Sequence, residues 1–338
     1  MDRLLHNDDF AVKRPVKAVV QFGPNYVFHL AAAARIGFDS EYAEKYAGSV
    51  EESDLGFLQQ HRELLTFGMG SGSDLITIFL FLPAYFDLQS GAHFAEYFSL
   101  LDEGCAVGGF RALFNHYGSE FERLGLWITK TEFEKDLSGI VHHRELIGKL
   151  GGIVMRNLPA YRDSVWPVES AKMDEVSSAI NVHFSALNPI SAWEKVTGID
   201  YKLDCFRATL VSAIKNGPNA DSLAYDTVVF HHDRPFDYMV QLIQHEIGSH
   251  ILNETMRQLA DLEKYEWNTL YAAYECLAKH YNQMLIGVEQ PAYSLASLRE
   301  EQFLPIYRSV HKAQPAITPR ELLLRGLDSY LNGATCIS

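Results

Sequence analysis

Residues 236–260 read FDYMVQLIQHEIGSHILNETMRQLA. The apolar residues of this stretch recur at helical spacing, so it predicts one long helix. The helix carries His245, Glu246 and His250 in the pattern H-E-x-x-x-H. Zinc peptidases commonly carry H-E-x-x-H on a helix, with one residue fewer between the histidines. The extra residue decides whether the two imidazoles can share a metal ion.

A regular helix keeps these histidines apart. At about 100° per residue, His250 lies roughly 140° around the axis from His245. The apolar residues before and after the motif also fall on different sides. They are Val240, Ile243 and Ile247 before it, and Leu252, Met256 and Leu259 after it. A π-bulge near Gly248 or Ser249 rotates the second half by about 100°, which joins the apolar stripes and brings the histidines together. We therefore predict a bulge and a metal site.

A simpler alternative stays open for the same residues. In a regular helix Glu246, His250 and Glu254 stand at positions i, i+4 and i+8, which form one polar stripe facing water. The motif would then arise by chance among 14 histidines in 338 residues.

A catalytic zinc site also needs a third protein ligand and an open position. The candidates downstream are Glu254, Glu263, Glu266, Glu275 and His280. Residues 265–285 predict a second helix, whose apolar stripe lies opposite Glu275. Its position alone therefore also fits a solvated surface glutamate.

The segments HEIGSHIL and YECLAKHYNQ resemble the tubulin-tyrosine-carboxypeptidase family of metallopeptidases and its bacterial relatives. That family carries HEIGTH, followed by a glutamate in an E-G-L-A context on the next helix. The resemblance implies a zincin-like region with zinc ligands His245, His250 and Glu275, and with Glu246 as the general base. It covers about residues 205–330, so the identity of the substrate does not transfer.

This chain departs from the family pattern at three positions. Ser249 replaces the usual threonine, Cys276 replaces the usual glycine, and Tyr274 stands where a second acidic residue is frequent.

Composition narrows the classes of function. A net charge of −14 disfavours a nucleic-acid surface and an anionic membrane. The apolar run Leu75–Leu82 is too short to span a bilayer. The four cysteines form no C-x-x-C pair, and the first residues lack the apolar core of a signal peptide. We expect a cytoplasmic protein with a peptide or protein substrate.

The expected fold is α+β and predominantly helical. We predict a helical N-terminal region over residues 1–165 and a zincin-like metallopeptidase region over 166–338, with a linker at 161–167. Strands at 206–214 and 223–230 predict a hairpin. This small sheet would lie beside the active-site helix and offer an edge strand to a peptide.

The predicted function is that of a zinc-dependent peptidase, carboxypeptidase-like by resemblance, in which Glu246 acts as general base for hydrolysis. Candidates for binding the oxyanion or a substrate carboxylate are Tyr307, Arg308 and Arg325. The alternative is a non-catalytic helical binding or structural protein with a degenerate or absent metal site.

Overall fold

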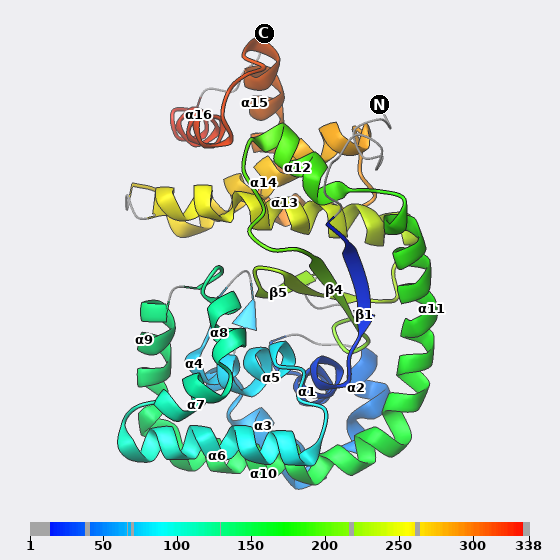
Figure 1. Ribbon diagram of the computed structural model, residues 1–338, viewed down its shortest axis with the longest axis vertical. Helices are drawn as coiled ribbons and strands as arrows, with labels where there is room; N and C mark the ends of the chain where they lie inside the picture. Colours follow the sequence, from blue (N-terminus) through cyan, green and yellow to red (C-terminus); the bar gives the residue numbers. More distant parts are fainter. Residues whose placement is uncertain are drawn as a thin grey trace. The chain divides into compact units, whose positions relative to one another are not determined.

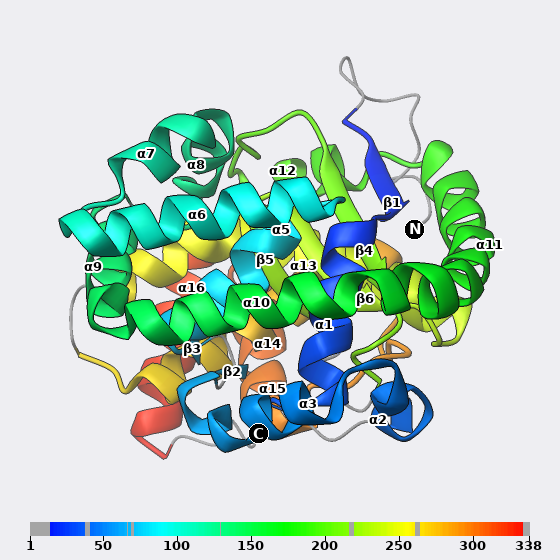
Figure 2. The same ribbon diagram turned by 90° about the horizontal axis from the view of Figure 1, so that it is seen from below.

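The computed structural model describes residues 14–37, 41–65, 67–68, 71–128, 130–215, 220–260 and 264–333. It is mostly helical, with a small mixed four-stranded sheet, which confirms an α+β protein in which helices predominate. Figures 1 and 2 show two views of the ribbon. The zincin-like character of the C-terminal region stays a prediction.

The chain divides into two compact units that interleave along the sequence. Unit 1 comprises Met1–Lys17, Ile180–Phe206 and Arg234–Ser338, and unit 2 comprises Ala18–Ala179 and Arg207–Asp233. This division follows contacts in space and has several crossing points, whereas the sequence suggests one boundary after residue 165.

The helices of unit 2 differ widely in length. They are α1 (Phe22–Ala33), α2 (Glu41–Tyr46), α3 (Glu52–Gln60), α4 (Asp74–Ile76), α5 (Leu82–Tyr85), α6 (Gly91–Val107), α7 (Arg111–His116), α8 (Gly118–Leu124), α9 (Lys130–Ile140), α10 (Arg144–Ala160) and most of α11 (Trp166–Ser185). Short 3-10 turns occupy Ala47–Ser49, Arg62–Leu65 and Val141–His143, and a two-stranded ribbon joins β2 (Phe67–Gly68) to β3 (Ser71–Gly72). Helices α6 and α10 lie side by side (Figure 2).

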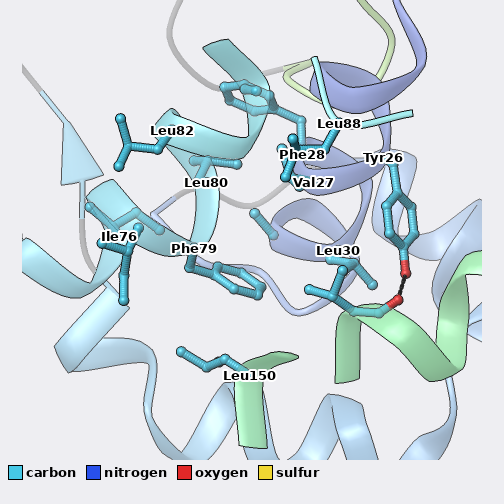
Figure 3. Close-up of a cluster of buried hydrophobic side chains, with 14 of the residues drawn as sticks. Tyr26, Val27, Phe28, Leu30, Ile76, Phe79, Leu80, Leu82, Leu88 and Leu150 are labelled. Carbon is cyan, nitrogen blue, oxygen red and sulfur yellow. Dashed lines mark hydrogen bonds between the residues drawn. The ribbon is translucent and has the colours of Figure 1, made fainter. Parts of the chain in front are cut away.

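Helix α1 lies inside unit 2 and is buried on nearly every side. Figure 3 shows its side chains Tyr26, Val27, Phe28 and Leu30 within a cluster of apolar residues. The Tyr26 hydroxyl donates a hydrogen bond to the carbonyl of Val154 on α10 (2.5 Å). Because the phenol has a partner, the ring can be buried without leaving an unsatisfied polar group.

The main sheet consists of β1 (Val16–Val20), β4 (Phe206–Val211), β5 (Ala220–Ala224) and β6 (Thr227–His231), in the order β1-β4-β6-β5. Strand β6 runs parallel to β4 and antiparallel to β5. The predicted hairpin between 206–214 and 223–230 is therefore wrong. Residues 223–230 contain the end of β5, a turn and most of β6. The hairpin is therefore formed by β5 and β6. Strand β5 belongs to the connection that the parallel pair of β4 and β6 requires.

The strand order also corrects the proposed route for a substrate. Strand β6 directly precedes the H-E-x-x-x-H helix, but it lies between β4 and β5. Both of its hydrogen-bonding edges are used, so β6 cannot accept a peptide by strand addition. The placement of the sheet beside that helix stays a prediction.

The segment 161–167 is helical, which corrects the prediction of a linker. Residues Tyr161–Val165 form one π-turn between α10 and α11, and the amide of Trp166 bonds to the carbonyl of Tyr161. Tyr161 and Val165 are buried. Packing thus keeps the chain helical next to Pro167, and the wider turn absorbs the local irregularity.

Unit 1 contains α12 (Pro189–Thr197), α13 (Phe236–Ala260), α14 (Trp267–Ile286), α15 (Glu300–Ala313) and α16 (Pro319–Leu331), with a 3-10 turn at Ala296–Leu298. Helix α13 contacts α12, α14 and α16. A capping box between Thr318 and Glu321 starts α16. Across the described ranges, every helix is too short or too polar to cross a bilayer.

Asn25 on α1 gives a test of how unit 2 is held together. It is fully buried, its amide donates to the carbonyls of Gln21 (3.0 Å) and Leu210 (2.9 Å), and its oxygen accepts from the amide of Ser212 (3.2 Å). Asn25→Ala leaves these buried groups unpaired and should lower the free energy of unfolding by about 2–4 kcal/mol. Denaturant unfolding followed by circular dichroism measures the loss.

The matched control is Asn115→Ala on α7, because Asn115 is exposed. A surface substitution of this kind should change stability by less than about 0.5 kcal/mol. Equal effects of the two variants would show that Asn25 does not hold α1 to the end of β4.

Candidate metal centre

Helix α13 is α-helical from Phe236 to Ala260 without a π-turn. The predicted bulge near Gly248 or Ser249 is therefore wrong. The chain does form π-turns elsewhere, at Thr77–Phe81 and Tyr161–Val165.

The bulge was expected because it would join two apolar stripes into one face. Helix α13 does not need one face, because α12, α14 and α16 all pack against it. Ile243 and Ile247 are buried, and so are Leu252 and Leu259 in the second half. A helix that is covered on several sides buries both stripes without any change of register.

Gly248 has a packing role. A Cβ at this position would lie 2.1 Å from the indole of Trp193 on α12, so only glycine lets the ring approach the helix. The indole Nε1 donates to the carbonyl of Gln244 (2.9 Å). The sequence predicts a distortion at Gly248, whereas the structure shows a close contact with Trp193.

Two further side chains donate to carbonyls of α13 near the motif. The Tyr274 hydroxyl bonds to the carbonyl of Ser249, and Asn282 Nδ2 bonds to the carbonyl of Gln241 (3.0 Å). Both residues belong to α14. These donors align α14 with the part of α13 that carries His245.

His245 and Glu275 meet inside unit 1, as the resemblance implies for two zinc ligands. The distance from His245 Nε2 to Glu275 Oε2 is 2.9 Å. Both side chains are buried, and His245 is fully covered. Glu275 is therefore not a solvated surface glutamate. The other ring nitrogen, His245 Nδ1, is buried and has no hydrogen-bond partner among the described residues.

His250 does not join this pair. It lies five residues further along a regular helix, which is roughly 140° of rotation and about 7.5 Å of rise from His245. Its ring packs against Phe206, with ring centroids 5.6 Å apart. The described part of the chain contains no group of three His, Cys, Asp or Glu side chains placed to hold one metal ion. The structure thus assembles two of the three implied ligands.

Glu246, the implied general base, is partly buried. The Ser249 hydroxyl donates to the Glu246 carboxylate (Oγ to Oε2, 3.3 Å) and to the Glu246 carbonyl (3.0 Å). Ser249 stands where the family has threonine, and either residue supplies this hydroxyl. The contact limits the rotamers of Glu246 next to His245.

The alternative third ligands have other surroundings. His280 pairs with His311 (3.0 Å), and burial together with the neighbouring His311 and Arg308 lowers the pKa of His280 to about 3. Glu266 accepts from Thr269, and Glu254 is exposed. Glu263 lies outside the described residues.

The three candidates for substrate binding lie on α15 and α16. Tyr307 is fully buried and donates to the carbonyl of Ala273 (2.9 Å). Arg308 donates to Gln283 Oε1 (3.1 Å). Arg325 is exposed and lines a groove along α16. A role for them in binding substrate stays a prediction, and the bond to Ala273 gives Tyr307 a role in holding α15 against α14.

Sequence reasoning missed Tyr293 and the residues that hold it. The Tyr293 ring lies 5.1 Å from the His245 ring, centroid to centroid. Lys279 Nζ donates to the Tyr293 carbonyl (3.2 Å) and to Glu300 Oε2 (2.5 Å), and both Lys279 and Tyr293 are buried. Lys279 pairs with Glu300, 21 residues further along the chain, so no local spacing marks this ion pair. Tyr293 lies in a loop, and no pattern in the sequence marks it.

The Glu300 carboxylate, which pairs with Lys279, stays ionised near neutral pH. Burial disfavours the charge of Glu300, but hydrogen bonds from Lys279 and from the amide of Leu295 outweigh it and lower the pKa of Glu300 below its usual value. Glu300 therefore stays ionised and keeps Lys279 in place.

Comparison with known proteins adds no relative: no protein-family model, curated protein or solved structure matches the chain. The assignment to the metallopeptidase family stays a prediction that depends on the residues quoted from α13 and α14.

The contact between Gly248 and Trp193 predicts a large effect of one methyl group. Gly248→Ala places a carbon inside the volume of the indole, so α12 or α13 must shift. We expect a loss of about 1–3 kcal/mol in the free energy of unfolding, as for other overpacked sites. Tryptophan fluorescence during denaturant unfolding measures it.

Gly148→Ala on α10 is the matched control, because a Cβ at Gly148 meets nothing within 4 Å. This variant should gain up to about 1 kcal/mol from helix propensity. If Gly248→Ala is also neutral or stabilising, α12 does not pack on α13 as described.

Proposed function

We propose that unit 1 is a zinc-dependent hydrolase that acts on peptide bonds. The observation that supports this most is the buried contact between His245 and Glu275. Burial of an ionisable pair costs free energy, which makes this pair a candidate for a functional role. His245 is followed directly by Glu246 in the H-E-x-x-x-H motif, which is similar to the H-E-x-x-H motif of zinc peptidases.

The donors match the chemistry of zinc, which binds imidazole nitrogen and carboxylate oxygen at about 2.0–2.2 Å. His245 Nε2 and Glu275 Oε2 lie 2.9 Å apart, so both would be available to one ion. The unpartnered His245 Nδ1 shows that direct contacts do not fully satisfy this imidazole.

The third donor requires a change in the backbone. His250 is the implied ligand, but the regular helix directs it elsewhere. Its entry requires a change of helical register between Gly248 and His250. Trp193 and Tyr274 donate to the carbonyls of Gln244, before that point, and Ser249, at it.

The residues of the chain have separate roles in this proposal. His245, Glu275 and, after the change of register, His250 would hold the zinc ion, which would supply Lewis-acid chemistry. Glu246 accepts a proton from the attacking water and passes it to the leaving amine. Ser249 orients the Glu246 carboxylate. Release of a C-terminal residue is proposed from the resemblance, while cleavage within a chain is the alternative outcome.

A second candidate is a helical binding or structural protein without a metal. The unbroken helix α13 and the packing of His250 against Phe206 favour it. In that case the contact of His245 with Glu275 is a buried hydrogen bond that only stabilises α13 against α14.

Zinc content separates the two candidates. The purified full chain should bind one zinc ion per molecule, measured by elemental analysis after dialysis. Loss of a ligand should weaken zinc binding more than about 100-fold, so His245→Ala and Glu275→Gln should lose the metal. His142→Ala is the control, because His142 is exposed and in unit 2. Zinc that is absent from the wild type, or retained in both ligand variants, would contradict the proposal.

Glu246→Gln tests the base. The amide keeps the shape of the side chain but cannot accept the proton. The variant should therefore bind zinc normally, and its rate of hydrolysis should fall by about 10²- to 10⁴-fold. The assay is mass spectrometry of a peptide library incubated with each variant, read at both peptide ends. Full hydrolysis by Glu246→Gln would refute the mechanism.

A further inference from the structure

A groove runs along α16 on the side opposite its buried leucines. Helix α16 is the last helix of the described chain and packs against α15 (Figure 1). The groove has a volume of about 810 Å³, within the range of about 300–1,000 Å³ that is usual for ligand sites. Its apolar wall consists of Pro315 and Ile317, which precede α16, and of Leu324 on the helix itself. Arg325 follows Leu324 and is exposed.

Arg325 is the charged side chain of this groove that has no partner within the described residues. It lines the groove together with two carboxylates, Glu321 and Asp328. They stand four residues before Arg325 and three residues after it, a spacing at which ion pairs on a helix are expected. In the part of the chain that the structure describes, Arg325 forms neither an ion pair nor a hydrogen bond. All five N–H donors of its guanidinium are therefore available to a ligand.

The two carboxylates are engaged in bonds that hold α16 in place. Glu321 Oε2 accepts from the hydroxyl (3.0 Å) and from the amide (3.3 Å) of Thr318, in the capping box that starts the helix. Asp328 Oδ1 accepts from Lys264 Nζ (3.0 Å) and from the Tyr265 hydroxyl (3.1 Å). Because each carboxylate already has its donors, the positive charge of the arginine remains for a ligand.

The walls of the groove are fixed before any ligand binds. A Cβ at Gly326 would lie 2.3 Å from the ring of Tyr307, so glycine lets α16 lie directly against α15. In the turn between the two helices, the amide of Ile317 bonds to the carbonyl of Gln314 (3.1 Å). A preformed site loses no free energy by ordering itself around its ligand.

We propose that this groove binds a peptide segment in which an acidic residue stands beside an apolar residue. The planar guanidinium of Arg325 receives the carboxylate through two parallel hydrogen bonds. Leu324 and Ile317 receive the apolar side chain. This inference does not depend on the proposed hydrolase function, and it adds a partner-binding surface to unit 1.

An open groove suits a peptide better than a small molecule. Sites for small molecules enclose about 70–90% of the surface of the ligand. This groove is open to solvent, and Pro315 and Arg325 are exposed on it, so a ligand gains enough contact only along its length. The net charge of −14 repels an acidic partner, but at physiological ionic strength this repulsion is screened beyond about 8 Å. The contact with Arg325 is made within that distance.

Fluorescence polarisation of a labelled peptide tests the inference with the full chain. The probe is GSLELSG, with fluorescein at its N-terminus and an amide at its C-terminus, and GSLQLSG is the matched peptide without the carboxylate. Wild type should bind the acidic peptide about 10-fold more tightly, because it adds a hydrogen bond between charged groups. Arg325→Gln should weaken binding of GSLELSG about 10-fold and leave binding of GSLQLSG unchanged. Leu324→Ser should weaken binding of both peptides about 3- to 10-fold.

Arg320→Gln is the matched control, because Arg320 is exposed on α16 and does not line the groove. It should leave both dissociation constants within about twofold of wild type. Equal affinity of wild type for the two peptides, undetectable binding of GSLELSG, or an equal loss in Arg320→Gln overturns the inference. Complete competition by 4-methylpentanoate at concentrations near the dissociation constant of the peptide also overturns it, because the groove would then serve a small apolar carboxylate.

Discussion

The burial of α13 within unit 1 is the constraint on which the rest of that unit depends. Helices α12, α14 and α16 cover it, so its polar residues must find partners inside the protein. Trp193, Tyr274 and Asn282 meet its carbonyls, and Glu275 meets His245. Well-packed apolar side chains alone would be enough to hold α13 in place. The histidine and glutamate are costly in such a place, and this cost is the reason to assign them a function.

The motif and the helix agree only in part. His245 and Glu275 meet, as the resemblance implies, whereas His250 follows the regular helix to Phe206. Five residues of a regular helix cannot direct two imidazoles to one ion. The metal itself would have to provide the free energy for a change of register, and metal binding commonly supplies several kcal/mol or more to the folding of its ligands. Such a change would have to displace the contacts of Trp193 and Tyr274 with the carbonyls of Gln244 and Ser249.

Much of the fold could be predicted from the sequence. The apolar periodicity of 236–260 predicts α13 closely. The helix expected over 265–285 corresponds to α14, which spans Trp267–Ile286. The register of α13 could not be predicted from its own sequence. Apolar stripes on two sides indicate either a bulge or burial on several sides, and the choice depends on the helices that pack around α13. The parallel pairing of β4 and β6 was missed, because a short turn at Tyr225 and Asp226 lies inside a run that appeared to be one strand. At the site, the pair of His245 and Glu275 was expected from resemblance. Tyr293 was not, because a loop residue is positioned by contacts distant in sequence.

X-ray absorption at the zinc edge of the purified full chain tests the central claim most directly, because it reports which atoms surround the ion. A site made by His245, His250 and Glu275 predicts two imidazoles and one carboxylate in the first coordination shell, with zinc–nitrogen and zinc–oxygen distances of about 2.0–2.2 Å. One imidazole only would mean that α13 keeps its register and that His250 is not a ligand. A shell without imidazole, or a protein that retains no zinc, would contradict a metal centre on α13.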